Sequence, residues 1–474
     1  MKKIILVLVP ALFLLACTKD LTKLNDDPKR PIDVASGPLF TYAQRQLVTT
    51  ITSANVNVNI FRLIEQQWQE TTYVSESRYN LTNRAIPDQW WNYFYQRVLN
   101  NFKESRKYMA TDVIDLNQRK NDLAILDIME VYTWHYLVTT FGNVPYTEAL
   151  NVDNTFPKYD DALTIYKALL VRLDQDIAAL NPAAASLGSV DAIYAGDPAK
   201  WKKFGNSLKL KLALTISDAD NTIAKAAAES AIAGGVFTAN DDNAKFPFSS
   251  ITPNTNPVWV DLVQSGRLDF VAASTITTIM TDLKDPRLPL FFTQDGTGNY
   301  SGGTPGASSA YANFSHAAVA LTAANFDGNI LDYSEVEFLI AEATERGYTT
   351  GSTPAAAYNK AITASITDWG GTDAQATAYL AQTTVKYETA SGTYKEKIGT
   401  QKWISLYNRG TDAWLEQRRL DYPELPLPSR AVSGFPNRFT YPVNEQNVNE
   451  TNRVAAAAAI GGDVVETRLF FDKF

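Results

Sequence analysis

The stretch DYSEVEFLIAEATERGYTTGSTPAAAYNKAITASITDW, residues 332–369, decides the fold class of this chain. Its first half places apolar residues at the i, i+3, i+4 and i+7 spacing of one helix face. Ser334 and Glu337 have the spacing of a capping box at the start of this helix, and we expect Gly347 to end it. A polar turn follows, and residues 355–369 carry a second apolar stripe. The stretch therefore predicts a helical hairpin.

Comparable helix pairs are expected at 121–181 and 201–233, where apolar residues again recur at helical spacing. Asn181-Pro182 closes one of these helices, and Asp197-Pro198 opens another. Each pair fits either a degenerate tetratricopeptide-type hairpin, with a repeat of about 34 residues, or a generic helical hairpin. Either alternative builds a scaffold or a docking face, so we expect a mainly α fold interrupted by long irregular loops.

The first residues have the features of an exported lipoprotein precursor. Lys2 and Lys3 precede an uncharged apolar run, Ile4–Ala16, which is too short to span a bilayer core of about 30 Å. A basic start, a short apolar core and a small residue at its end are typical of a secretory signal. The run leads into LLAC, which resembles a bacterial lipobox, so Cys17 is expected to carry a lipid after removal of residues 1–16. The alternative is an ordinary signal peptide followed by a chance cysteine.

Composition limits the remaining possibilities. Cys17 is the only cysteine, which excludes disulfides and a cysteine-based metal site or nucleophile. Residues 17–35 favour an extended, lipidated tether, and 36–474 are expected to form one domain with loop-rich insertions around 245–330. No later stretch approaches membrane-spanning length, so the lipid anchor is the one expected membrane contact. The formal net charge of −8, with no basic cluster, argues against a nucleic-acid partner.

Short blocks of sequence follow one another in a characteristic order behind Cys17. They are LNDDP (24–28), FGNVPYTEAL (141–150), PKYD (157–160), IYAGD (193–197), DPRL (285–288), EVEFLIAEATERG (335–347), QKW (401–403) and the C-terminal Trp414, Arg418, Arg419, Tyr441 and Glu445. Together they resemble the SusD/RagB-like nutrient-binding outer-membrane lipoproteins of Bacteroidota. The chain departs from the family pattern at Asn143, where Asp is more frequent, and at Thr215, where Arg is common.

The resemblance implies a SusD-like helical fold with tetratricopeptide-type hairpins, on a lipid-anchored outer-membrane protein that faces the exterior. It also implies a partner, a SusC-like TonB-dependent outer-membrane barrel, which the lipoprotein covers as a lid while it delivers captured ligand. Family ligands are mostly oligosaccharides, with peptides in some members, and no cofactor is expected. The expected function is nutrient binding and gating, and the chain is not expected to be an enzyme.

Aromatic residues outside helical stripes are the candidate ligand contacts, because aromatic faces pack on the apolar faces of sugar rings. Trp68, Tyr73 and Tyr79 lie among polar residues and are expected at the surface. Residues 294–329, here called the long loop, are rich in Gly, Ser, Thr and Ala, and no periodicity buries their aromatic residues. Burial in the core is the alternative for Trp90, which starts a helix together with Trp91 and Phe94. The full set of candidates is Trp68, Tyr73, Tyr79, Trp90, Trp259, Tyr300, Tyr311 and Phe314.

Three alternatives to a glycan-binding lid stay open. A peptide receptor of the same lid type would show a trench lined by Asn and Gln instead of an aromatic arc. An α/α-type glycoside hydrolase would need two carboxyl groups about 5–9 Å apart. An interaction scaffold would use the helix pairs to dock the barrel. His135 and His316 are the only histidines and no HExxH motif occurs, so no metal site is predicted and His135 is expected to be a core residue.

Overall fold

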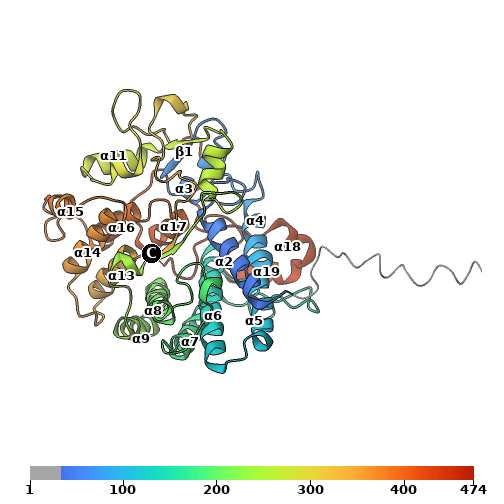
Figure 1. Ribbon diagram of the computed structural model, residues 1–474. Coiled ribbons are helices and arrows are strands. Elements are labelled where there is room, and N and C mark those ends of the chain that lie inside the picture. Colours follow the sequence, from blue (N-terminus) through green and yellow to red (C-terminus); the bar gives the residue numbers. More distant parts are fainter. Residues whose placement is uncertain (1–33, 474) are drawn as a thin grey trace, which may run out of the picture.

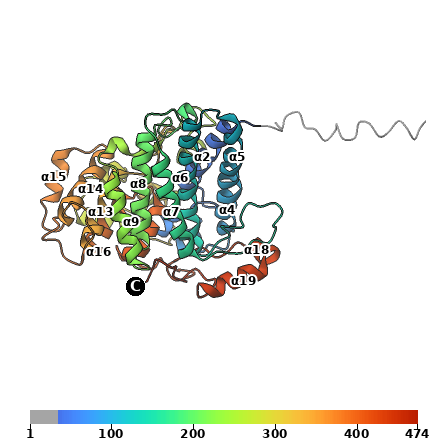
Figure 2. The same cartoon turned by 90° about the horizontal axis from the view of Figure 1, so that it is seen from below.

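Pairs of neighbouring helices form the scaffold of the computed structural model, which describes residues 34–473. The long helices are α2 (Ser36–Thr52), α5 (Asn100–Asp112), α6 (Leu116–Phe141), α7 (Ala162–Ala179), α8 (Pro198–Thr215), α9 (Asn221–Gly234), α13 (Tyr333–Glu345), α14 (Pro354–Asp368), α16 (Tyr394–Ser405) and α17 (Gly410–Leu420). The pairs α6–α7, α8–α9 and α13–α14 pack side by side, and contacts of α8 with α7 and α13 join them into one row (Figures 1 and 2). This row confirms the predicted mainly α fold and its helix pairs.

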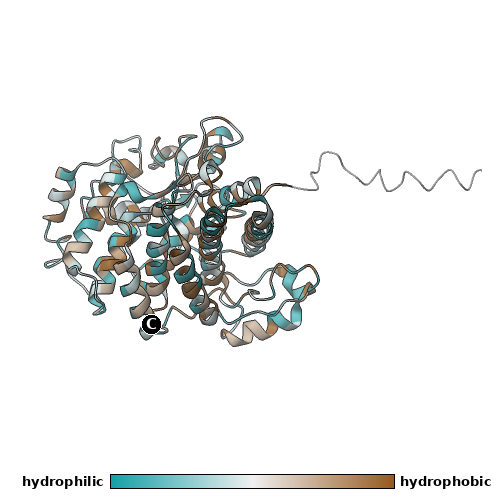
Figure 3. Ribbon diagram, turned by 60° about the horizontal axis from the view of Figure 1, so that its bottom comes forward, coloured by the Kyte–Doolittle hydropathy of each residue, from teal (hydrophilic) through white to brown (hydrophobic). Residues whose placement is uncertain are grey.

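The predicted signal peptide, the lipidated Cys17 and the tether up to residue 33 lie outside the described residues. The first described helix, α2, begins at Ser36, and its buried face carries residues such as Phe40, Leu47 and Val48. No helix among the described residues is both long enough and apolar enough to cross a membrane. Along the helices, hydrophilic and hydrophobic residues alternate in stripes (Figure 3), as expected for helices that bury one face.

The start of α13 corrects one local prediction. Asp332 caps this helix, because its carboxylate accepts a hydrogen bond over 2.7 Å from the backbone N–H of Glu335. The capping box predicted at Ser334 is therefore wrong, since Ser334 already lies inside the helix. Its hydroxyl instead donates over 2.7 Å to the Ala361 carbonyl in α14 and ties the two helices together. Gly347 follows the last turn with a positive φ of 76°, which suits its predicted role as a stop.

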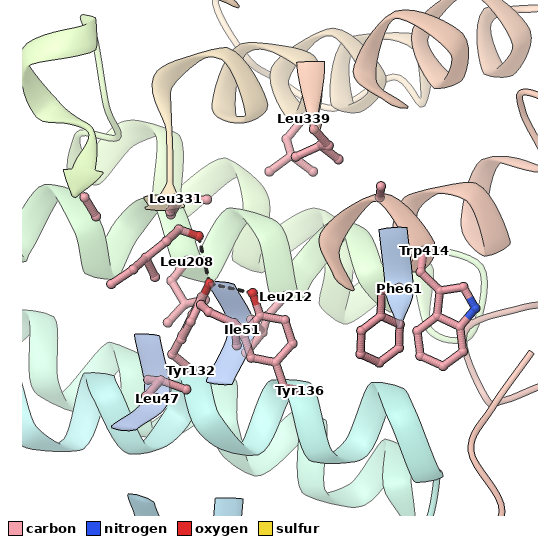
Figure 4. Packing of buried hydrophobic residues seen from close by; sticks show 14 of the residues in the cluster. Leu47, Ile51, Phe61, Tyr132, Tyr136, Leu208, Leu212, Leu331, Leu339 and Trp414 are labelled. Carbon is pink, nitrogen blue, oxygen red and sulfur yellow. Dashed lines mark hydrogen bonds between the residues drawn. The ribbon is translucent and has the colours of Figure 1, made fainter. Parts of the chain in front are cut away.

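Helix α6 runs through the centre of the scaffold and is buried on nearly all sides. The hydroxyls of Tyr132 and Tyr136 lie 2.7 Å apart, and Tyr132 donates to the Ile330 carbonyl over 2.7 Å (Figure 4). His135 is fully buried and its Nδ1 contacts the hydroxyl of Tyr166, which confirms the predicted core histidine. Burial lowers the pKa of His135 well below its ordinary value, so the imidazole is neutral.

A cluster of buried charges joins α8, α13 and α17. The Arg409 guanidinium lies 2.9 Å from Asp332, 2.7 Å from Glu335 and 2.9 Å from Asp412. Lys211 pairs with Glu335 over 2.8 Å and also contacts Asp412. Buried charges are costly unless they are paired. The cluster therefore fixes how these three helices meet.

Short elements complete the fold. Between residues 53 and 99 they are α3 (Phe61–Ile64), β1 (Trp68–Glu70), η2 (Glu76–Arg78), α4 (Ile86–Asn92) and the π-helical η3 (Tyr93–Leu99). The region predicted as loop-rich insertions contains β2 (Ala244–Phe246), α10 (Pro257–Trp259), η6 (Val260–Gln264), β3 (Phe270–Ala272), α11 (Ser274–Asp282), α12 (Leu288–Phe291), η7 (Tyr311–Asn313) and β4 (Gly328–Leu331). The other short helices are η4 (Gly188–Val190), η5 (Asn240–Asp242), α15 (Asp373–Leu380), α18 (Val443–Val448) and α19 (Glu450–Ala459). The strands form two antiparallel pairs, β1–β3 and β2–β4.

Candidate functional site

The β1–β3 ribbon is the platform of the candidate site. Its register places Trp68 opposite Ala272 and Glu70 opposite Phe270. The Trp68 and Phe270 rings lie against each other with centroids 5.5 Å apart. Two segments separated by about 200 positions thereby present an apolar base, and β1 packs against α3.

The long loop is fixed on this platform by hydrogen bonds from β1. The side chain of Gln69 donates to the Ala307 carbonyl over 2.8 Å and accepts from the Gly306 N–H over 3.0 Å. The N–H of Ser309 donates to the Thr71 carbonyl over 2.9 Å, as if it continued the ribbon. Because these bonds satisfy backbone groups on both sides, the loop has a defined position over β1.

A tight polar turn starts the long loop. The Asp295 carboxylate accepts hydrogen bonds from the hydroxyls of Ser301 and Thr297 over 2.6 Å each, and from the Thr297 and Asn299 N–H groups. These hydrogen bonds, led by that of Ser301, lower the pKa of Asp295 below its ordinary value. The hydrogen bonds to the Asp295 carboxylate therefore hold this turn closed.

Above the platform lies an open recess of about 290 Å³. It is lined by Trp68, Leu262, Val263, Arg267, Asp269, Phe270, Val271, Thr293, Tyr311, His316, Ala317, Val319 and Thr322. The Tyr311 and His316 rings stack with centroids 3.7 Å apart and an interplanar angle of 8°. The His316 Nε2–H donates to the Tyr311 carbonyl over 2.7 Å, which holds the two rings together. The recess therefore has a preformed, half-buried aromatic wall.

Charged side chains border this recess. Arg267 and Asp269 form an ion pair of 2.7 Å, and their side chains are 62% and 36% exposed. Both residues, with Phe270, also line a smaller neighbouring hollow of about 30 Å³ that includes Tyr73 and Arg84. An aromatic wall beside exposed groups that donate and accept hydrogen bonds suits a ligand with apolar ring faces and polar edges.

The structure brings three of the predicted aromatic residues together at this place. Trp68 and Tyr311 line the recess, and Tyr73, 69% exposed, lines the hollow beside it. The expected surface position of Tyr79 is wrong, because its ring is buried and its hydroxyl donates to the Ile64 carbonyl. Trp68 was also expected at the surface, and only its edge reaches the recess, since the residue is 3% exposed.

The other predicted residues lie elsewhere. Trp90 is fully buried and packs edge-on against Phe61, as its alternative interpretation allowed. Trp259, Tyr300 and Phe314 are half-buried and do not line the recess or the hollow beside it. Of these three, Tyr300 packs against the hydrophobic core.

Most residues that line the recess were not predicted, among them Arg267, Asp269, Phe270 and His316. Arg267, Asp269 and Phe270 reach it only through the pairing of β3 with β1, which no local pattern announces. The sequence analysis considers His316 only as a possible metal ligand. A histidine in the long loop, outside any apolar stripe, was the one available signal for its role in an aromatic wall.

Comparisons with known proteins agree with this architecture. A SusD-like family model described as "Starch-binding associating with outer membrane" matches residues 28–442. A solved chitin-binding protein superimposes with a TM-score of 0.80 at 26% identity, covering 93% of this chain and 100% of that one. A chitin-binding SusD homologue from Flavobacterium johnsoniae has a TM-score of 0.78 at 24% identity and covers 92% and 97%. A SusD homologue from Bacteroides uniformis has a TM-score of 0.79 at 25% identity and covers 92% and 99%. No protein with a curated description matches the chain.

Proposed function

We propose that the chain captures oligosaccharides in the recess over the β1–β3 ribbon, because it belongs to the SusD-like family of starch-binding proteins associated with the outer membrane. The observation that carries this proposal is the Tyr311–His316 stack next to the exposed Arg267–Asp269 pair. A pyranose ring can pack its C–H face on such a wall while its hydroxyl groups exchange hydrogen bonds with the ion pair.

The lining of the recess favours a glycan over a peptide. Among the described residues that line it there is no Asn or Gln, the side chains that best pair with an extended peptide backbone. Its polar groups lie beside aromatic and aliphatic surface instead. Asp269 is the one carboxylate in the lining, whereas glycoside hydrolysis ordinarily needs two facing carboxyl groups. The first point supports a glycan ligand, and the second supports binding without turnover.

We also infer that Cys17 anchors the protein by lipid and that a SusC-like TonB-dependent barrel is its partner, with this protein as the lid. The lipobox-like LLAC and the tether predicted from the sequence of residues 17–35 support the anchor. The relatives' association with the outer membrane supports the location. A lid needs one face that binds the ligand and a separate scaffold. We assign the first role to the recess and the second to the helix row.

Isothermal titration tests the ligand class. Protein lacking residues 1–17 is titrated with hexamers of N-acetylglucosamine and of α-1,4-glucose, chosen from the relatives that bind chitin or starch, and with a peptide mixture. Saturable binding of a hexasaccharide supports the proposal. Binding of peptides alone would mean that the ligand is a peptide. Absence of binding for every saccharide would contradict glycan capture.

Affinity purification from native outer membranes tests the lid. A tagged full-length chain should co-purify with a TonB-dependent barrel, and a Tyr311→Ala variant should do so equally well, because the recess is distinct from the helix row. Recovery of the tagged chain alone under conditions that keep the outer membrane proteins folded would contradict the partnership.

A further inference from the structure

A cavity with a volume of about 570 Å³ lies beside the recess, on the other side of residues 317–323. Small-molecule sites typically have volumes of roughly 300–1,000 Å³. We propose that this cavity, here called the inner cavity, is a second binding site that takes a neutral saccharide of one or two rings. The proposal rests on the assigned function only for the choice of ligand class, since a different set of residues forms this site.

An aromatic side wall gives the inner cavity a surface for a sugar ring. Trp369, half-buried at the end of α14, lies 5.9 Å from Phe326 and 5.6 Å from Tyr407 between ring centroids. The Tyr407 ring in turn stacks on Phe291 with centroids 4.3 Å apart. This packing fixes the indole of Trp369 while it remains part of the cavity lining, as a platform for a pyranose face requires.

Residues of the lining also hold polar atoms that have no partner among the described residues. They are Nε of Arg409, Oγ1 of Thr411 and Oδ1 of Asn329. Arg409 and Thr411 are buried to more than nine-tenths. Buried polar atoms are rarely left without hydrogen bonds. One donor, one acceptor and one hydroxyl that can do both match the hydroxyl groups of a saccharide, which also donate and accept.

The charge of the lining selects against an anionic ligand. Its carboxylates are Asp327, Asp332, Asp368 and Asp412, and its cations are Lys245 and Arg409. Lys245 is engaged by Asp368 over 2.6 Å, and Arg409 by the buried cluster. Because no cation is left over to neutralise a ligand carboxylate or phosphate, the lining favours a neutral ligand.

A thin wall separates the inner cavity from the recess. Residues 317–323 form it: Ala317, Val319 and Thr322 line the recess, whereas Ala318, Ala320 and Ala323 line the inner cavity. The two sites are thus neighbours with different linings. Neighbouring positions on this wall give matched variants, since Val319 is 79% exposed and Ala320 is also exposed.

The test compares Ala320→Trp, which fills the mouth of the inner cavity, with Val319→Trp, which obstructs the recess. N,N′-diacetylchitobiose and maltose are titrated into the wild type and both variants. We expect Ala320→Trp to weaken binding of a disaccharide at least tenfold and Val319→Trp to leave this binding within twofold. For a hexasaccharide bound in the recess we expect the reverse: Val319→Trp weakens its binding, and Ala320→Trp leaves its binding nearly unchanged.

Thr411→Val provides a second variant that keeps the side-chain shape. It removes a buried hydroxyl that has no protein partner, so stability should stay the same or rise, while disaccharide binding falls. The inference is overturned if no disaccharide binds, or if disaccharide binding is insensitive to both Ala320→Trp and Thr411→Val. Failure of the proposed function can be distinguished from failure of this inference. If glycan capture in the recess is wrong, hexasaccharides do not bind, even where disaccharides do.

Discussion

The indole Nε1 of Trp68 donates a hydrogen bond over 3.0 Å to the hydroxyl of Tyr407, and each ring lines a different cavity. Trp68 lies under the recess and Tyr407 borders the inner cavity. Both residues are almost fully buried. The bond therefore joins the β1–β3 platform to the segment before α17, between the recess and the inner cavity.

Replacing Tyr407 by Phe should destabilise the fold. The change leaves the buried Trp68 N–H without its acceptor, which costs about 1–3 kcal/mol in the free energy of unfolding. Urea unfolding followed by tryptophan fluorescence measures the loss. The matched control is Tyr73→Phe, because Tyr73 is 69% exposed and its change should stay within about 0.5 kcal/mol. Equal stabilities of the two variants would contradict a structural role for the bond.

The stacked wall of the recess should dominate hexasaccharide binding. Tyr311→Ala and His316→Ala each remove one ring of the stack, and we expect each to weaken the affinity about tenfold or more, or about 1.4 kcal/mol. Phe314→Ala is the matched control, since Phe314 belongs to the same loop but does not line the recess. Circular dichroism confirms that the fold is kept. If Phe314→Ala weakened binding as much as Tyr311→Ala, the site would not be the stacked pair.

The buried charge cluster should be sensitive to loss of one partner. Lys211→Met leaves the buried carboxylates of Glu335 and Asp412 with Arg409 as their one remaining ion-pair partner, and should cost about 3–5 kcal/mol. Lys107→Met is the control, because Lys107 lies 3.6 Å from Glu104 and is 66% exposed, so its change should stay within about 1 kcal/mol. Thermal unfolding of both variants measures how much stability each one loses. A tolerated Lys211→Met would show that the cluster is not needed for stability.

Acid should destabilise the fold in part through Glu342. Burial alone would raise the pKa of this carboxyl, but Arg419, 2.6 Å away, and Arg346 lower it from 4.5 to about 2. Above pH 4.5 the folded state gains from the ionised carboxylate, and this stability is lost as the pH falls from 4.5 toward 2. By pH 3 the loss should reach about 2 kcal/mol. Urea unfolding at pH 6 and pH 3 should show a smaller drop for Glu342→Gln than for the wild type, and identical drops would contradict the assignment.

Cys17→Ala should release the protein from the outer membrane. Without the thiol no lipid can be attached, so the chain should move from the membrane fraction to the soluble fraction and should no longer incorporate labelled palmitate. Ser36→Ala, in α2 and away from the lipobox, is the control and should stay membrane-bound. Retention of the Cys17→Ala variant in the membrane fraction would mean that another feature of the chain anchors it.

The local parts of the fold could be predicted from the sequence because neighbouring residues determine them. The α13–α14 pair and the stop at Gly347 depend on helical periodicity and a nearby glycine. The buried positions of Trp68 and Tyr79 could not be predicted in this way. Trp68 lies between Gln67 and Gln69, a pattern that suggests a surface strand, yet both glutamines are fully buried under the long loop.

The composition of the recess also depends on distant pairing. Phe270 reaches Trp68 through the β1–β3 register, and His316 reaches Tyr311 through the folding of the long loop. Three-residue strands leave only weak sequence patterns, so no local rule brings these rings together. The kind of residue at the site was therefore predictable, whereas the set that meets there was not.

The most direct test of glycan capture is a crystal structure of the chain lacking residues 1–17 with a bound hexasaccharide that titration has identified. The account predicts a sugar ring packed on Tyr311, with hydroxyl groups within hydrogen-bond distance of Arg267 or Asp269. A saccharide bound at another surface, with the Tyr311–His316 wall facing solvent alone, would contradict it.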